Sequence, residues 1–328
     1  KNQTYLSAST TNSGGILPNN SYNRYNFTAR NTTHFLNDKL TLDIGAQYIV
    51  QNNKNMVSQG QYYNPLPSLY LFPRGDNFDE IRLYERYNTN YGYMEQYWPY
   101  GDASLSLQNP YWIQNRINRT SNKKRYMMNA SLKWQAADWL NVVGRVNLDN
   151  SDYRNKNEKS ASTLTTFCGV SGGFEDAMRQ ERSLYADFLA NIDKTFGDFH
   201  LTANVGASIY HTSMDQLYIA GDLVIPNFFQ INNINFSANY KPDPTGYEDE
   251  IQSIFASAEL SWKNQLYLTV TGRNDWDSKL AFSKQKSFFY PSVGLSALLS
   301  EMVKLPEVIS YAKIRGSYTA VSYTHLRA

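Results

Sequence analysis

The sequence is poor in cysteine and has no long apolar run, and each scarcity excludes a class of protein. With one cysteine, Cys168, among 328 residues, the chain cannot form an intramolecular disulfide framework. Cys168 lies in a Gly- and Ser-containing segment with no obvious histidine partner, which favours an incidental loop thiol over a nucleophile. No run of about 18 apolar residues occurs, so a transmembrane helix is excluded.

Histidines and acidic clusters are too sparse to predict an enzyme. The acidic runs Asp79-Glu80 and Glu248-Asp249-Glu250 could serve calcium or a glycosidase-like acid pair, but charged loop residues are usually solvated. The segment Gly169–Gly173 lacks the glycine spacing of a phosphate-binding loop. We predict no catalytic residue, no metal and no cofactor. The four histidines have neither the spacing nor the neighbouring residues of zinc ligands: His34, His200, His211 and His325.

Charge and hydropathy leave a membrane protein open and argue against a nucleic-acid partner. The formal net charge is only +2, and the basic residues are scattered rather than gathered in a stripe. The mean hydropathy of −0.55 does not exclude a membrane, because a membrane β-barrel needs only every second strand residue to be apolar. Aromatic residues make up 15% of the chain, including 26 tyrosines, and this composition suggests an extended, strand-rich protein.

The stretch from Ser253 to Leu299 shows the pattern that the rest of the chain repeats. Apolar residues alternate with polar ones because successive side chains of a strand point to opposite faces. One face of the first strand is apolar and the other is polar, with Phe255 as the exception. A short turn at 263–265 leads into a second strand of the same kind. The apolar face carries Ile254, Ala256, Ala258, Leu260 and Trp262, then Leu266, Leu268 and Val270.

The same alternation of apolar and polar residues predicts about eleven antiparallel strands along the chain. The connections between them are expected to alternate strictly between short and long. We expect Tyr5–Ser9 to be the tail of a first strand, followed by a loop over Thr10–Asn20. Complete strands are expected to have ten or more residues, enough for the roughly 9–11 that a tilted membrane strand needs. The predicted long loops cover 52–124, 151–180, 212–249 and 276–286.

Alternation alone does not distinguish a membrane barrel from a β-sandwich, but strand length, alternating connections and aromatic placement favour the barrel. The mid-strand apolar faces carry no charge, as a lipid face requires, although a buried core would exclude charge too. The opposite faces would line a wet lumen, with Asp43, Lys133, Arg145, Asp187, Glu259, Arg273, Lys313 and Arg315. Aromatic residues beside the short turns would form an interfacial girdle: Phe35, Trp134, Trp139, Phe196, Phe199 and Trp262.

Aromatic residues also gather in the first long loop. Flat rings beside amide groups suit the binding of sugar rings or peptides by stacking and hydrogen bonding. The alternative is that these side chains pack the loop against itself or against a partner. The candidate substrate-binding residues are Tyr97, Trp98, Tyr100, Asn109, Tyr111 and Trp112.

Several motifs resemble the SusC/RagA-like TonB-dependent outer-membrane transporters. Two late-strand runs, Tyr267-Leu-Thr-Val-Thr-Gly-Arg-Asn-Asp-Trp276 and Tyr290-Pro-Ser-Val-Gly-Leu-Ser296, carry most of the likeness, with Ser278-Lys-Leu280 between them. Asn109-Pro-Tyr-Trp112 and Ile225-Pro-Asn-Phe-Phe229 resemble loop motifs of the same family. The resemblance implies a C-terminal transmembrane barrel of 22 strands, of which this all-β chain is a segment holding roughly half, with long external loops and short periplasmic turns.

The resemblance also implies import of glycans or peptide-like nutrients across a bacterial outer membrane. The expected partners are TonB, a SusD-like surface lipoprotein over the external loops and outer-membrane lipid. The plug domain and energy-coupling segment are not seen here, so we expect residues 1–321 to be a partial barrel that does not transport alone. Residues 322–328 do not match the family, and our hypothesis is that they are a sequence artefact. At the barrel rim, Arg273 and Asp275 are expected to form an ion pair beside Trp276.

Two hypotheses about function from other protein classes stay open. A siderophore or cobalamin-type TonB-dependent receptor shares the architecture, but its family would not explain the motifs between Tyr267 and Ser296. A soluble carbohydrate-binding surface module would explain the loop aromatics and predicts a chain that folds in water without detergent.

Overall fold

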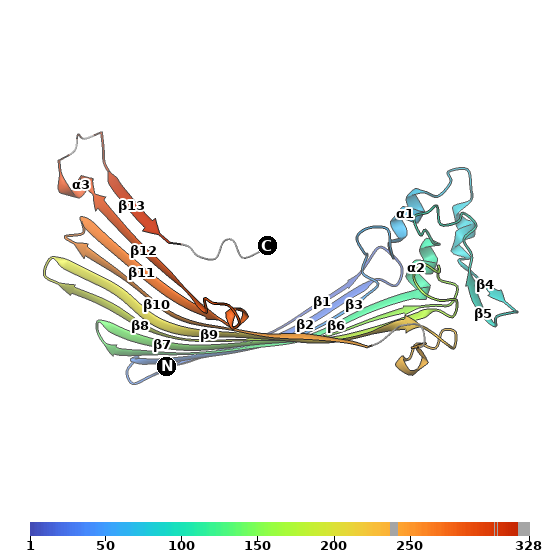
Figure 1. Ribbon diagram of the computed structural model, residues 1–328, viewed down its shortest axis with the longest axis horizontal. Coiled ribbons are helices and arrows are strands. Elements are labelled where there is room, and N and C mark those ends of the chain that lie inside the picture. The colour runs from blue at the N-terminus through green and yellow to red at the C-terminus, as the bar shows by residue number, and fades with distance from the viewer. Residues whose placement is uncertain (237–241, 305, 307, 321–328) are drawn as a thin grey trace.

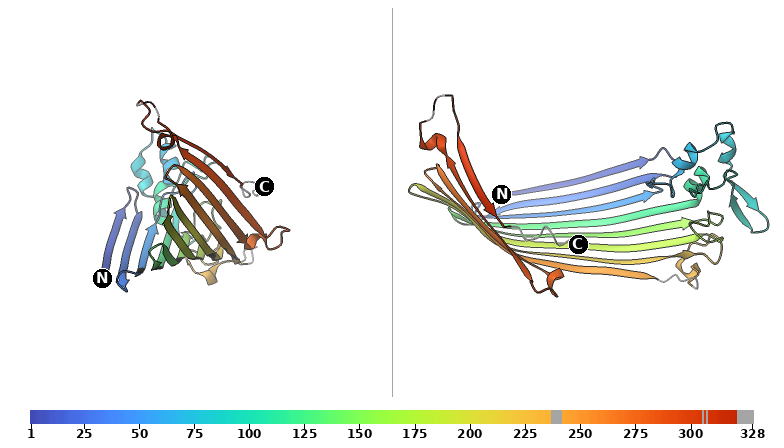
Figure 2. Two further views of the ribbon diagram at one scale, coloured as in Figure 1. Left: turned by 90° about the vertical axis from the view of Figure 1, so that its left-hand side faces the viewer. Right: turned by 45° about the horizontal axis from the view of Figure 1, so that its top comes forward.

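A computed structural model describes residues 1–236, 242–304, 306 and 308–320, and it contains one large curved antiparallel sheet. Eleven strands follow one another in chain order, and the edge strands β1 and β13 do not pair, so the sheet is an open trough (Figures 1 and 2). The predicted all-β fold of about eleven strands is confirmed. The strands are β1 (Asn2–Gly14), β2 (Ser21–Phe35), β3 (Leu40–Lys54), β6 (Ile117–Ala137), β7 (Leu140–Lys159), β8 (Gly173–Phe196), β9 (Phe199–Asp222), β10 (Asp243–Trp262), β11 (Leu266–Asp277), β12 (Ser287–Leu298) and β13 (Lys313–Thr319).

The alternating sequence gives the sheet two chemically different faces. Ile117 and Lys159 are buried where the loop carrying α1 (Pro65–Tyr70) and α2 (Pro110–Arg116) covers the concave side (Figure 1), so their face of the sheet is the concave one. The apolar series points the other way, to the convex side. Val205 and Phe188 remain 53% and 54% exposed there because no other part of the chain covers them. An uncovered apolar band of this kind is what a lipid-facing barrel wall presents.

The concave face is polar and is crossed by ion pairs between neighbouring strands. Arg145 of β7 lies 2.8 Å from Asp187 of β8, and the hydroxyl of Tyr185 also donates to Asp187 at 2.8 Å. Arg30 and Asp43 form a similar pair between β2 and β3. Charged groups that pair across strands in this way suit a wall that faces water rather than lipid.

Phe255 breaks the alternation because its ring fills the space left by a glycine. It lies directly opposite Gly206 on the concave face. A Cβ atom added to Gly206 would lie 2.6 Å from the Phe255 ring, so any larger residue would displace that ring. The glycine and the aromatic residue therefore form one packing unit on the polar wall.

The strands are longer than the sequence pattern predicted. β6 to β10 have 20 to 24 residues each, so β7 and β8 run through the predicted 151–180 loop and leave only 160–172 as the connection. The predicted 52–124 and 212–249 loops shrink in the same way. Directly beyond the apolar band both faces carry mostly polar residues, so the alternation disappears while backbone pairing continues. For the same reason β1 extends to Gly14, beyond its predicted end at Ser9.

Short and long connections alternate less strictly than predicted. Most short turns fall at one end of the sheet, at 36–39, 138–139, 197–198 and 263–265. The exceptions are the 15–20 connection at the long-loop end and the 299–312 connection, with α3 (Leu299–Met302), at the short-turn end. The predicted tail at 322–328 lies outside the described residues.

Two small cores form at the long-loop end. On the convex side, the segment after β9 with η2 (Ile231–Asn233) folds back so that Leu223 and Ile234 pack on Phe174 and Ile219. On the concave side, the 55–116 connection holds α1, η1 (Phe78–Arg82), the hairpin β4 (Glu85–Asn88) and β5 (Tyr93–Gln96), and α2. Among the described residues, no helix has the length and apolarity needed to span a membrane.

Candidate functional site: the external loop platform

Four connections at the long-loop end, 15–20, 55–116, 160–172 and 223–236, are joined into one unit, here called the loop platform. Asn109 is its central polar residue and is fully buried. Its side-chain oxygen caps α2 by accepting from the Tyr111 backbone N–H at 2.9 Å. Its side-chain nitrogen donates to the carbonyls of Ile81 and Tyr97 at 2.8 and 2.9 Å. One amide thus fixes three parts of the 55–116 connection.

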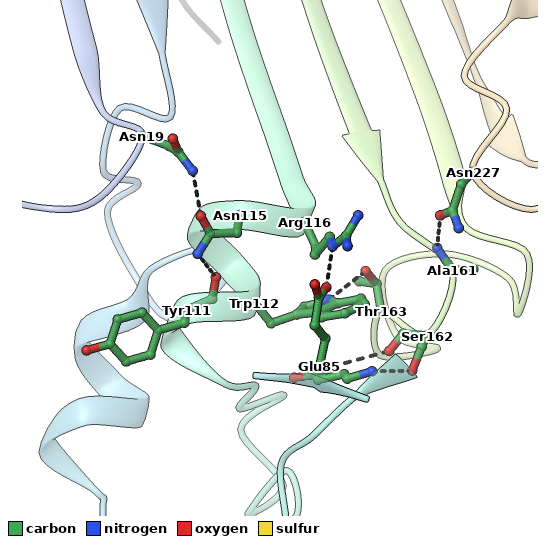
Figure 3. A network of polar contacts seen from close by, with 11 residues as sticks. Asn19, Glu85, Tyr111, Trp112, Asn115, Arg116, Ala161, Ser162, Thr163 and Asn227 are labelled. Carbon is green, nitrogen blue, oxygen red and sulfur yellow. Dashed lines mark hydrogen bonds and ion pairs between the residues drawn. The ribbon is translucent and has the colours of Figure 1, made fainter. Parts of the chain in front are cut away.

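Trp112 is the main apolar contact of the platform. It has no exposed surface and packs with Ile113 and Ile117 at the end of α2. Its ring nitrogen donates to the hydroxyl of Thr163 at 3.0 Å, so the same side chain joins the 55–116 and 160–172 connections (Figure 3). A buried Trp that also satisfies its N–H is a strong anchor.

Asparagine side chains join the outer connections to this centre (Figure 3). Asn19 donates to the side chain of Asn115 at 2.6 Å, which ties the 15–20 connection to α2. Asn227, from the Ile225-Pro-Asn-Phe-Phe229 motif, accepts from the Ala161 backbone N–H at 2.8 Å. All four connections are therefore held by specific hydrogen bonds, and the platform is pre-organised.

Charges at the base of the platform are partly buried. Burial opposes the charge of Lys159, but the nearby Glu175 carboxylate outweighs it and raises the pKa of the ammonium above its ordinary value. Burial lowers the pKa of the Arg119 guanidinium, which has no carboxylate partner in the described residues. The Cys168 thiol is buried, and burial is the chief cause that raises its pKa to about 11, which disfavours the thiolate.

The candidate substrate-binding residues divide into two groups. Asn109 and Trp112 lie in the interior and hold the platform together, so they present no surface to a ligand. The other four lie at its surface, where Arg86 covers the Tyr97 ring at 3.5 Å and Trp98 contacts Tyr100 edge-on at 5.0 Å. The rings form a continuous series in the order Trp98, Tyr100, Phe72, Phe78 and Tyr111.

Sequence reasoning missed Phe72, Phe78 and Thr163. Phe72 and Phe78 lie within the aromatic-rich loop, so aromatic density was a usable signal for them. Thr163 has no such signal, because its contact with Trp112 spans 51 residues and depends on the fold.

The motif at the end of β11 holds the predicted ion pair. Arg273 lies 2.7 Å from Asp275 and also donates to the hydroxyl of Ser253, all on the concave face. Trp276 points to the convex side and is 41% exposed. In the part of the chain that the structure describes, no group of three or more His, Cys, Asp or Glu side chains could hold a metal ion.

Comparison with known proteins assigns the fold to a family. The family model described as TonB dependent receptor-like, beta-barrel, matches residues 62–326. The chain belongs to this TonB-dependent receptor family. Members of this family are outer-membrane receptor barrels, and the family is not a known enzyme family. A barrel of this kind agrees with the uncovered apolar band and the polar concave wall. No curated protein matches the sequence.

Three solved structures resemble this chain in fold. The RagAB peptide importer in its open-open state matches at a TM-score of 0.70 with 14% identity, covering 97% of this chain and 34% of that chain. The FpvA receptor of P. aeruginosa bound to pyoverdines matches at 0.51 with 13% identity, over 93% and 36% of the two chains. The ferric preacinetobactin receptor BauA of Acinetobacter baumannii matches at 0.50 with 12% identity, over 90% and 40%. The chain thus spans 34–40% of the length of these three chains.

Proposed function

We propose that the chain is part of an outer-membrane transporter that imports glycans or peptide-like nutrients together with a SusD-like surface lipoprotein. The main support for this proposal is the structure of the loop platform. A pre-organised surface at the external end of a barrel wall, bearing a continuous series of aromatic rings, suits the capture of oligomers by stacking and hydrogen bonding. The stronger fold likeness to the peptide importer than to the siderophore receptors supports this branch of the family. Energy would come from TonB, through parts of the protein outside this chain.

The loop aromatics Tyr97, Trp98, Tyr100 and Tyr111 are the proposed contact surface. These four residues are half-buried and keep some exposed surface, whereas Trp112 is fully buried in the interior. A lipoprotein lid seated on the same edge would close a captured oligomer against these rings and shield it from water. Asn109 acts on this surface indirectly, because it fixes both Tyr97 and the start of α2.

Uptake by cells that carry or lack the full-length gene tests this proposal. Cells would be offered labelled oligosaccharides and peptides, with and without an uncoupler that removes the energy supply to TonB. We expect gene-dependent, uncoupler-sensitive uptake of one of these classes, and co-purification of a surface lipoprotein. Gene-dependent uptake of a ferric siderophore or cobalamin, without a lipoprotein partner, would contradict it.

A further inference from the structure

The external half of the concave wall carries three cations without a carboxylate partner. Arg24 on β2, Lys123 on β6 and Arg119 on β6 form no ion pair with any described residue. The register places Arg24 opposite Gln51 and Gln51 opposite Lys123, so Arg24 and Lys123 lie at one level across three strands. Strands are spaced by about 4.8 Å, which puts their Cα atoms roughly 10 Å apart. Arg119 lies on the same face, four residues nearer the loop platform.

The other cations on this part of the concave wall each pair with a carboxylate, so these three differ in having no anionic partner among the described residues. Arg125 pairs with Asp149, Arg179 with Glu181 and Lys159 with Glu175. The acid Asp243 lies on β10, four strands from β6, or about 19 Å away. That separation exceeds the Debye length of about 8 Å at physiological salt, so Asp243 does not offset the positive potential.

The protein holds two of these side chains in place. The Lys123 ammonium lies 4.6 Å from the centre of the Tyr153 ring. The Arg119 guanidinium donates to the carbonyls of Met56 and Tyr63 at 2.8 and 3.4 Å, at the base of the loop platform. Its contacts are all neutral, so its positive charge is not cancelled by the groups that orient it.

Neutral groups around the cations have the chemistry of a sugar site. The side chain of Gln51 lies between Arg24 and Lys123 and accepts from the Tyr22 hydroxyl at 3.4 Å. Tyr22 and Tyr153 add flat rings on the same concave face. Amides and tyrosines bind the hydroxyls and apolar faces of sugars, and the cations add recognition of carboxylates.

We propose that the strip formed by Arg24, Gln51, Arg119, Lys123 and Tyr153 binds the carboxylates of an acidic oligosaccharide as it passes from the loop platform into the barrel. This inference rests on the proposed function and narrows its substrate class. The strip adjoins the loop platform, since the Arg119 backbone N–H donates to the side chain of Asn55, the residue that follows β3 and opens the 55–116 connection. The cations would attract the anionic chain by charge, and Gln51 and Tyr153 would align its rings.

Binding of two matched probes to the full-length protein in detergent tests this proposal. The probes are an oligogalacturonate and a neutral malto-oligosaccharide of equal length, measured by calorimetry. The Arg24→Ala/Lys123→Ala double variant should weaken binding of the acidic probe about tenfold or more, because each charge-assisted contact is lost, and leave binding of the neutral probe unchanged. Lys124→Ala is the control for the loss of the Lys123 charge: it removes one positive charge from the next residue, which faces the convex side, and should change the affinity less than about twofold. Heat-dependent gel mobility confirms that each variant keeps its barrel.

Three results would overturn the proposal: equal affinity of the wild type for acidic and neutral probes, an equal loss in Lys124→Ala, or binding of an acidic peptide through Lys123 while the oligogalacturonate does not bind. None of them removes gene-dependent, uncoupler-sensitive uptake, so the proposed function would survive such a failure. Loss of all energised oligomer uptake would instead remove the proposed function itself.

Discussion

An arginine placed at Val205 tests whether the convex face meets lipid. Val205 is central in the apolar part of β9, between Phe199 and Ile209, and 53% of it is exposed. Its cross-strand neighbours are Ala190 and Ala256, both small, so a longer side chain meets no steric barrier. Any loss of stability in Val205→Arg therefore reports the medium outside the sheet.

The expected loss is about 2–4 kcal/mol of unfolding free energy, the cost of Arg at the midplane of a lipid-facing barrel wall. Thr202→Arg is the control on the same strand. Thr202 faces the concave side opposite Asp193 and Glu259, so an added guanidinium finds two carboxylates and should cost close to zero. Val205→Leu keeps the site apolar and should also be near neutral.

Guanidinium unfolding of the full-length protein in lipid vesicles measures all three variants. Val205→Arg should shift the midpoint to lower denaturant, with Thr202→Arg close to the wild type. An unchanged Val205→Arg variant, or an equal loss in Thr202→Arg, would refute the assignment of the convex face to lipid.

Three further predictions concern the loop platform. Trp112→Ala should lower the stability of the loop platform by about 3–5 kcal/mol and make the 160–172 connection more sensitive to limited proteolysis. Cleavage of this connection at the wild-type rate would contradict the anchoring role of Trp112. Asn109→Asp keeps the cap of α2 but turns a carboxylate toward the carbonyls of Ile81 and Tyr97, so hydrogen exchange of the 55–116 connection should speed up by the equivalent of about 2–4 kcal/mol, with no change in the barrel strands. Alkylation of Cys168 should rise about tenfold per pH unit from pH 8 to 10 without levelling near its ordinary pKa of 9.0, because the raised value of about 11 keeps the thiol protonated; a plateau near pH 9 would show an exposed thiol.

Within the apolar band, the strands could be predicted from the sequence, because one face of each strand is apolar and the other is polar. Outside the band that signal is lost. Asp152 and Gln180 both lie on the convex face beyond the apolar series, and they pair across β7 and β8 although alternation no longer marks those segments as strands. The extension to 24 residues in β8 and β9 comes from backbone pairing with neighbours, which a local pattern does not encode.

The aromatic residues of the loop platform could be identified from the sequence, but not their division into interior and surface. Trp112 and Trp98 look equivalent in a loop without periodicity. Their difference arises because α2 turns Trp112 toward Thr163 of another connection, whereas Trp98 donates to the nearby Gly101 carbonyl. Contacts between distant segments decide which ring is buried, so burial here follows from the tertiary structure.

Gel mobility of the full-length protein with and without boiling, after cell fractionation, is the most direct test of the account. A closed outer-membrane barrel predicts a protein in the outer-membrane fraction that migrates faster before boiling than after it. A water-soluble product with the same mobility in both samples would contradict the barrel and leave a soluble binding module as the better explanation.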